Sequence, residues 1–290
     1  MKASGLLAAS ALAALVLAPA CGGTTGDQLI GFNAYASGVA GAGEPFSVNG
    51  YTIQLTSAQM YVGAVYVNEA PAGTGDSLDS PVCINSGTYC AQVPGGVEVN
   101  LLSTTPEPFA VMGNGTADLG QSWEIYLVDG DVNTPDNTGF GVPDTADLQG
   151  TATRESDGKV FSWAATVTIN QSNRGEPIEN QGTPGNYPIC KKRIIELGGP
   201  QATLFQGASL RLTIDPRGWF NLPIDFSSLP SVASTQCELD TTSDFGDAQY
   251  CIPDSSLLPG STLGSQQGIN LFTGIATAGS AYNLTYQKSP

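Results

Sequence analysis

Apolar and polar residues alternate with a period of two along much of the chain. The longest run places Phe161, Trp163, Ala165, Val167 and Ile169 on one side, with polar or small residues between them. Shorter runs of the same kind are centred on Ile53, Val99, Ile125, Leu212 and Leu284. A period of two sends successive side chains to opposite faces of a strand. About nine to eleven such segments predict an all-β fold, specifically an antiparallel β-sandwich of Ig-like or jelly-roll-like type.

Four long stretches without this alternation separate the expected strands. They cover residues 68–96, 129–149, 171–189 and 228–268, and they are rich in Gly, Pro, Ser, Thr, Asn and Asp. These residues favour turns and loops, and loops of this length in a compact domain are usually functional or disordered. We therefore expect a single domain over residues 28–290 that carries long loops.

The first 20 residues have the three parts of a secretory signal peptide. Lys2 supplies a positive charge, an apolar run follows, and Ala18, Pro19 and Ala20 precede Cys21. The run is shorter than the roughly 20 residues that span a bilayer, so we predict cleavage and export to the cell envelope. A retained membrane anchor is the alternative.

Cys21, after small residues and before a Gly- and Thr-rich stretch, resembles the lipidation site of bacterial lipoproteins. This resemblance implies a lipid on Cys21, a flexible tether over residues 21–27, and attachment to the outer membrane on its periplasmic or surface face. The chain departs from the pattern at Ala18, where Leu is usual. Ordinary cleavage after Ala20 is the competing interpretation.

The charge of the chain limits its partners. Its formal net charge is −16, and removal of Lys2 with the signal makes it −17. Binding to nucleic acid needs clustered Lys and Arg, so we expect no nucleic-acid partner. A protein or glycan partner, and the membrane reached through the N-terminal lipid, remain as expectations.

Cysteine usage fits an oxidising compartment. Two pairs are close in sequence, Cys83 with Cys90 and Cys237 with Cys251, and we predict a disulfide in each. Cys190 is then left over, either as a buried thiol or with a partner elsewhere.

The chain has no histidine. Ser-His-Asp and Cys-His catalysis and histidine-ligated metal sites are therefore excluded. We predict no catalytic residues, although a pair of carboxylates could still hydrolyse glycosides.

The best candidate site is a calcium loop. Asp129, Asp131, Asn133, Asp136 and Asp144 alternate with small and polar residues. Carboxylate and amide oxygens are the ligands that Ca²⁺ prefers. The loop starts like an EF-hand but has Thr134 and Phe140 at the positions of the turn glycine and the final glutamate. A solvated turn is the alternative, since Asp, Asn and Gly are also turn residues.

Three further groups have a functional and a structural interpretation. The acids of the 237–251 loop could hold a cation or form a solvated surface. The run of basic residues that follows Cys190 could bind anionic groups or protect a strand edge. The pair of adjacent aromatic residues could bind sugar, anchor a partner or cap the core. These groups are Glu238, Asp240, Asp244 and Asp247; Lys191, Lys192 and Arg193; and Trp219 and Phe220.

Three short blocks, at residues 51–62, 214–220 and 270–274, resemble lipoproteins of δ-proteobacteria of the myxobacterial type. The same blocks resemble, faintly, the methanobactin-associated periplasmic copper-binding family. The second resemblance implies a shared fold and copper binding, but the copper ligands would include histidine, which is missing here.

These observations together predict an envelope lipoprotein that binds a ligand without turning it over, with Ca²⁺ as a structural ion. A periplasmic metal-handling protein related to the copper-binding family is one alternative. A carboxylate-dependent hydrolase is the other.

Overall fold

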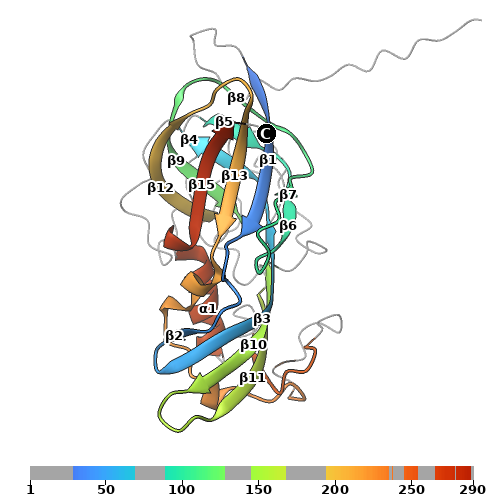
Figure 1. Cartoon of the computed structure of the whole chain (residues 1–290), viewed down its shortest axis with the longest axis vertical. Helices are drawn as coiled ribbons and strands as arrows, with labels where there is room; N and C mark the ends of the chain where they lie inside the picture. The colour runs from blue at the N-terminus through green and yellow to red at the C-terminus, as the bar shows by residue number, and fades with distance from the viewer. Residues whose placement is uncertain are drawn as a thin grey trace, which may run out of the picture.

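The computed structural model describes residues 29–68, 89–127, 145–167, 194–234, 237, 245–253, 265–277 and 279–288. These residues form two β-sheets with few helices, so the fold is mostly β, as the alternation predicts. The two sheets follow each other along the long axis of the molecule (Figure 1). We call them the upper and the lower sheet.

The upper sheet has nine strands in the order β12-β9-β4-β5-β8-β1-β13-β15, with β7 also paired to β1. The end strands of this order, β12 and β15, contact each other, so the sheet curls round on itself (Figure 1). The strands are β1 (Ile30–Gly38), β4 (Val65–Asn68), β5 (Tyr89–Val93), β7 (Glu107–Pro108), β8 (Gly113–Gly115), β9 (Leu119–Tyr126), β12 (Ile194–Thr203), β13 (Ala208–Ile214) and β15 (Tyr282–Lys288).

The lower sheet has six strands in the order β14-β11-β10-β3-β2, with β6 also paired to β3. Its longest strand, β3, continues through Gly63 and Ala64 into β4 of the upper sheet, which links the two sheets covalently. The strands are β2 (Phe46–Val48), β3 (Tyr51–Val62), β6 (Val97–Asn100), β10 (Ala146–Arg154), β11 (Val160–Val167) and β14 (Tyr250–Ile252).

The prediction of a purely antiparallel arrangement is wrong at two places. Strand β1 pairs with β13 in parallel, and β11 pairs with β14 in parallel. Both pairs join strands far apart in sequence, and parallel neighbours need such long connections. Alternation within one strand reports its faces but not the direction of its neighbour, so the sequence pattern does not distinguish the two cases.

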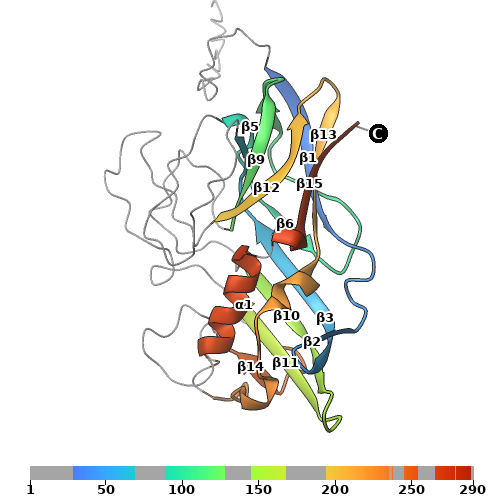
Figure 2. The ribbon, with the colours of Figure 1, turned by 90° about the vertical axis from the view of Figure 1, so that its left-hand side faces the viewer.

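The predicted loops also contain regular elements. Strand β5 lies within 68–96, and β14 and the start of α1 (Ser265–Thr277) lie within 228–268. Helix α1 packs beside the lower sheet (Figure 2), with the short 3-10 helices η2 (Pro216–Asn221), η3 (Phe226–Ser228) and η5 (Gly279–Ala281). Its close contact with η2 depends on Gly274, because an ideal Cβ there would lie 1.8 Å from the Trp219 carbonyl oxygen.

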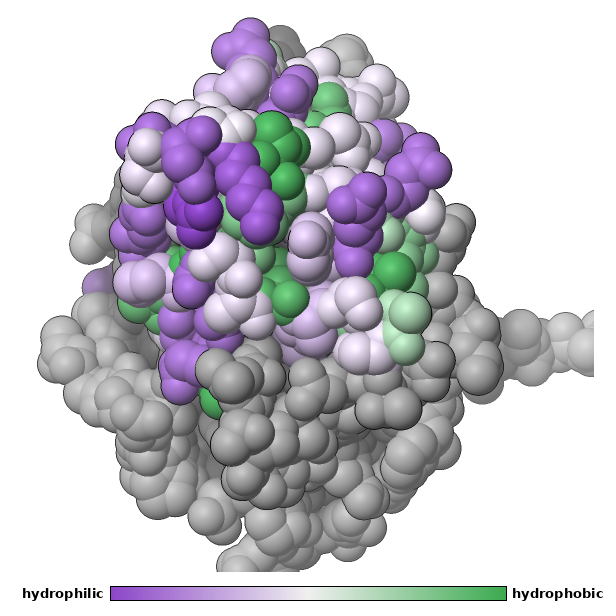
Figure 3. Space-filling view, turned by 90° about the horizontal axis from the view of Figure 1, so that it is seen from below, coloured by the Kyte–Doolittle hydropathy of each residue, from purple (hydrophilic) through white to green (hydrophobic). Residues whose placement is uncertain are grey.

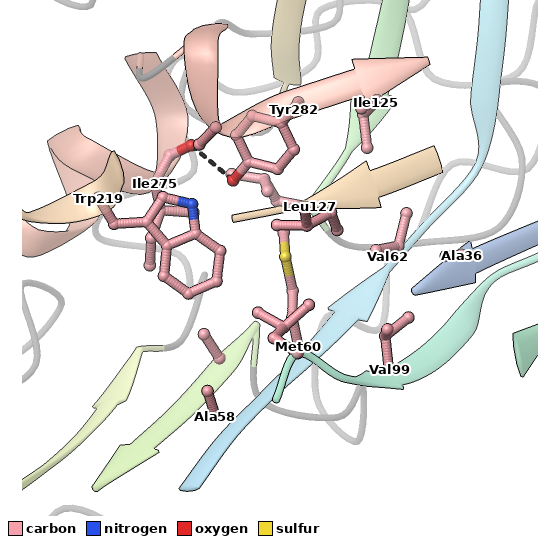
Figure 4. Packing of buried hydrophobic residues seen from close by; sticks show 14 of the residues in the cluster. Ala36, Ala58, Met60, Val62, Val99, Ile125, Leu127, Trp219, Ile275 and Tyr282 are labelled. Atoms are coloured by element: carbon pink, nitrogen blue, oxygen red, sulfur yellow. Dashed lines mark hydrogen bonds between the residues drawn. The ribbon is translucent and has the colours of Figure 1, made fainter. Parts of the chain in front are cut away.

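One hydrophobic core runs through both sheets. The same cluster contains Ile125 of β9, Leu127 directly after β9, Met60 of β3 and Trp219 of η2 (Figure 4). The Tyr282 hydroxyl, also in this core, donates to the Ile275 carbonyl oxygen at 2.9 Å. Burial raises the pKa of Tyr282, which keeps this hydroxyl protonated as a donor.

Candidate functional site

The residues predicted to bind calcium, Asp129, Asp131, Asn133, Asp136 and Asp144, lie outside the described residues. The ends of their segment are described. Leu127 and Thr145 are both fully buried, and the Thr145 hydroxyl donates to the Leu127 carbonyl oxygen at 3.5 Å. The segment therefore leaves and re-enters the fold at one point between β9 and β10. Calcium binding here stays a prediction.

Most of the other predicted groups lie outside the described residues as well. These are the signal peptide, Cys21, Cys83, Cys190, Lys191, Lys192, Arg193, Glu238, Asp240 and Asp244. The described part of the chain contains no group of three or more His, Cys, Asp or Glu arranged to hold a metal ion. None of its helices combines the length and the apolar character that crossing a membrane requires.

Cys237 and Cys251 form a disulfide with Cα atoms 6.0 Å apart, in the pairing that their spacing predicts. Both residues are buried. The bridge fastens the segment before β14 to that strand, and β14 pairs with β11 of the lower sheet. The pairing of Cys83 with Cys90 stays a prediction. Cys90 is buried, with its sulfur 3.5 Å from the Val67 carbonyl oxygen.

Trp219 and Phe220 are core residues. Both are almost completely buried, and the ring of Phe220 packs against Phe46 and Trp163 at centroid distances of 5.6 and 5.8 Å. This burial rules out the alternative in which these two rings form an exposed sugar-binding platform.

The most unusual chemistry lies on the upper sheet, on the face opposite the hydrophobic core. Strand register aligns one residue from each of five neighbouring strands: Glu196, Glu124, Tyr66, Gln92 and Asn114, in the order β12, β9, β4, β5 and β8. A transverse row of polar or hydroxyl-bearing residues thus crosses the sheet.

The centre of this face is buried even though it is polar. We call Asn68, Ser122 and Glu124 the polar cluster. Asn68 and Ser122 are Cα partners across β4 and β9, and Glu124 is one alternation further along β9. Glu124 and Ser122 are each 1% exposed and Asn68 is 5% exposed. Hence both faces of the sheet are buried at this point.

The Asn68 side-chain amide organises the polar cluster. Its Nδ2 donates to Glu124 Oε1 at 2.9 Å and lies 3.3 Å from the Ser122 hydroxyl oxygen. Its other polar atom, Oδ1, is buried and has no hydrogen-bond partner. A buried acceptor without a partner costs about 1–3 kcal/mol, so native proteins usually supply a donor, a water or an ion there.

Two tyrosines border the polar cluster on the same face. Tyr66 is the Cα partner of Glu124, and its ring meets that of Tyr126 edge to face at a centroid distance of 5.1 Å. Rings of this kind have an apolar body and a polar tip, which suits contact with a ligand of mixed character.

The sequence pattern predicts the strand but not the polar cluster. The alternation of Trp123 and Ile125 with Glu124 and Tyr126 predicts one apolar face and one polar face. The sequence signal is that Val65–Asn68 contains no charged residue, which fits a strand that the structure shows to be buried along its whole length. A strand buried on both faces next to one with an internal glutamate implies a buried carboxylate.

Comparison with protein-family models, with curated proteins and with solved structures found no match to this chain. The polar cluster and the calcium-type loop therefore have to be interpreted from their own chemistry.

Proposed function

We propose that the chain is an exported envelope lipoprotein that binds a ligand without turning it over. In this proposal a lipid on Cys21 holds it to the outer membrane, on the periplasmic or surface face. The β scaffold presents the long segments that follow β4 and β9 and precede β12, three adjacent strands of the upper sheet.

The observation that carries the proposal is the unpartnered Asn68 Oδ1 beside the buried Glu124 carboxylate. A buried polar group whose hydrogen bonds are incomplete calls for a donor, a water or an ion beside it. The Asn68 oxygen and the Glu124 carboxylate together favour the binding of a cation or of a hydrogen-bond donor. Ca²⁺ is the cation we propose, because the 129–144 segment, which follows β9 in the sequence, contains further carboxylate and amide groups of the kind that Ca²⁺ prefers.

The test is a pair of thermal melts of the mature chain, in EDTA and in millimolar Ca²⁺. We expect Ca²⁺ to stabilise the fold by about 2.7 kcal/mol when its concentration is about 100 times the Kd. Asp131→Asn and Asn68→Leu test whether the loop or the polar cluster supplies the ligands. Asp157→Asn, an exposed acid in the β10–β11 hairpin, is the matched control and should keep the full shift.

Two results would count against the proposal. If Ca²⁺ does not change the melting temperature, residues 129–149 are an ordinary acidic turn and not a calcium site. Turnover of glycoside or ester substrates by the purified chain would exclude a purely binding role.

One observation favours a second function. The strand register sets Glu196 opposite Glu124 as Cα partners across β12 and β9, and glycoside hydrolases use two acidic residues. Against this function, Glu124 is 1% exposed and thus shielded from a substrate. Loss of turnover in Glu124→Gln would support a hydrolase, and a substrate panel without turnover would remove it.

An Ig-like or jelly-roll-like sandwich with disulfide-stapled loops is the proposed detailed class, and kinship with δ-proteobacterial lipoproteins or the periplasmic copper-binding family is the proposed origin. Equilibrium dialysis without bound copper would exclude the metal-handling alternative.

A further inference from the structure

Exposed apolar side chains gather at one end of the molecule. Six large hydrophobic residues in the described part of the chain are exposed, and four of them are Leu29, Val111, Met112 and Phe205. Leu29 directly precedes β1, Val111 and Met112 directly precede β8, and Phe205 lies in the turn between β12 and β13. We call Leu29, Met112 and Phe205 the apolar pole.

Strand register brings the three residues of the apolar pole together. Phe32 pairs with Gly113, which places Met112 beside the outward face of β1, and a Cβ at Gly31 would lie 3.8 Å from Met112 Cε. On the other side of β1, the parallel pair of Asn33 with Ser209 brings the turn that contains Phe205 to the start of β1. These elements meet at the upper end of the molecule (Figure 1).

The opposite end of the molecule has a different surface. Seen from below, it carries hydrophilic residues with hydrophobic ones scattered among them (Figure 3). Val160, the most exposed hydrophobic residue of the lower sheet at 57%, lies in the β10–β11 hairpin at this end. Single exposed apolar residues are normal on a soluble surface, whereas gathered ones indicate an interaction site.

The position of the apolar pole along the chain indicates what covers it. Cys21 precedes Leu29 by eight positions, and eight extended residues reach at most about 28 Å. A lipid on Cys21 therefore keeps the start of β1, and with it the apolar pole, within that distance of the bilayer. The chain is strongly acidic, so attraction to anionic lipid does not provide the contact. One acidic residue, Asp118, follows β8 at this end, and its carboxylate accepts a hydrogen bond from the Thr116 hydroxyl.

We propose that the apolar pole rests on the lipid bilayer, with Leu29, Met112 and Phe205 in its interface, so that the lower sheet points away from the membrane. This inference rests on the proposed lipid anchor at Cys21. The contact orients the protein, and the anchor supplies most of the affinity.

Methionine oxidation provides the test, because the mature chain has two methionines, Met60 and Met112. Met112 is 59% exposed and Met60 is fully buried, so Met60 is an internal control. Oxidation of methionine follows exposure. The full chain acylated at Cys21 is placed in vesicles of phosphatidylethanolamine and phosphatidylglycerol and treated with dilute peroxide. The non-acylated Cys21→Ser chain is treated in the same vesicle suspension, and sulfoxide is measured by peptide mass spectrometry.

We expect oxidation of Met112 to be several-fold slower in the acylated chain than in Cys21→Ser, with Met60 unchanged. The double variant Leu29→Ser/Phe205→Ser should restore fast oxidation of Met112, while Val160→Ser should not. The intact mass of the mature chain reports acylation separately. An acylated chain with an unprotected Met112 would overturn the membrane contact alone, and a chain without an acyl group would overturn the anchor and the contact together.

Discussion

At the scale of single residues, one ion pair connects four parts of the fold. Asp215, at the end of β13, accepts two hydrogen bonds from the Arg217 guanidinium, at 2.8 and 2.7 Å. Arg217 also donates to the Gly41 carbonyl oxygen at 3.2 Å, and the Asp215 amide donates to Ala281 in η5. These bonds fasten η2 to the turn before β2 and to the segment before β15.

The hydrogen bonds from Arg217 lower the pKa of Asp215 below its usual range. A carboxyl whose pKa is lower in the folded state stabilises the fold above its unfolded pKa, and this contribution disappears as the pH falls through the folded pKa. We expect Asp215→Asn to destabilise the protein by about 1 kcal/mol near neutral pH, after allowing for partial exposure. The difference should shrink at about pH 3 and below.

Urea unfolding of both proteins at the two pH values measures this effect. Asp247→Asn, at an exposed acid, is the control and should change stability by less than about 0.5 kcal/mol. An equal difference at both pH values would contradict the assignment to the ionised pair.

At the scale of elements, helix α1 depends on close packing of its backbone against η2 more than on the helix propensity of its own residues. It spans Ser265–Thr277 and contains two glycines and two β-branched isoleucines, which are poor or moderate helix formers. Leu271, Phe272 and Ile275 are buried in the shared core. Tertiary packing therefore compensates for weak propensity, and this explains why no helix is predicted from the sequence here.

Gly274→Ala tests this interpretation. Alanine would favour an isolated helix by about 1 kcal/mol, but its Cβ would meet the Trp219 carbonyl oxygen at 1.8 Å. We expect a net destabilisation of about 2 kcal/mol, because the contact is with backbone and cannot relax cheaply. Chemical denaturation measures it, with the exposed Gln266→Ala in the same helix as control. A Gly274→Ala protein as stable as the wild type would mean that α1 is not packed on η2.

At the scale of the whole molecule, the two sheets share one core and one continuous strand. Trp123 in the upper sheet and Trp163 in the lower sheet belong to the same hydrophobic cluster, and β3 runs on into β4. Units that share a core and cannot separate without exposing it unfold together.

We therefore expect one cooperative unfolding transition in the mature chain. Calorimetry should show a single peak, and fluorescence of Trp123→Phe/Trp219→Phe and Trp163→Phe/Trp219→Phe variants, each of which keeps one tryptophan in a different sheet, should give coincident transitions. Two resolved transitions would show that the sheets are separate folding units. The conservative replacements retain most of the buried ring area, so both variants should fold.

The sequence by itself determined the β class, because period-two alternation reports local side-chain direction in strands such as β3 and β11. It also determined the pairing of Cys237 with Cys251, whose closeness in sequence makes loop closure easy. Only the tertiary structure decided the parallel pairs, helix α1 and the polar cluster. Each depends on contacts between residues far apart in the chain: Asn68 meets Glu124, and Gly274 meets Trp219, only when the sheets and the core are assembled.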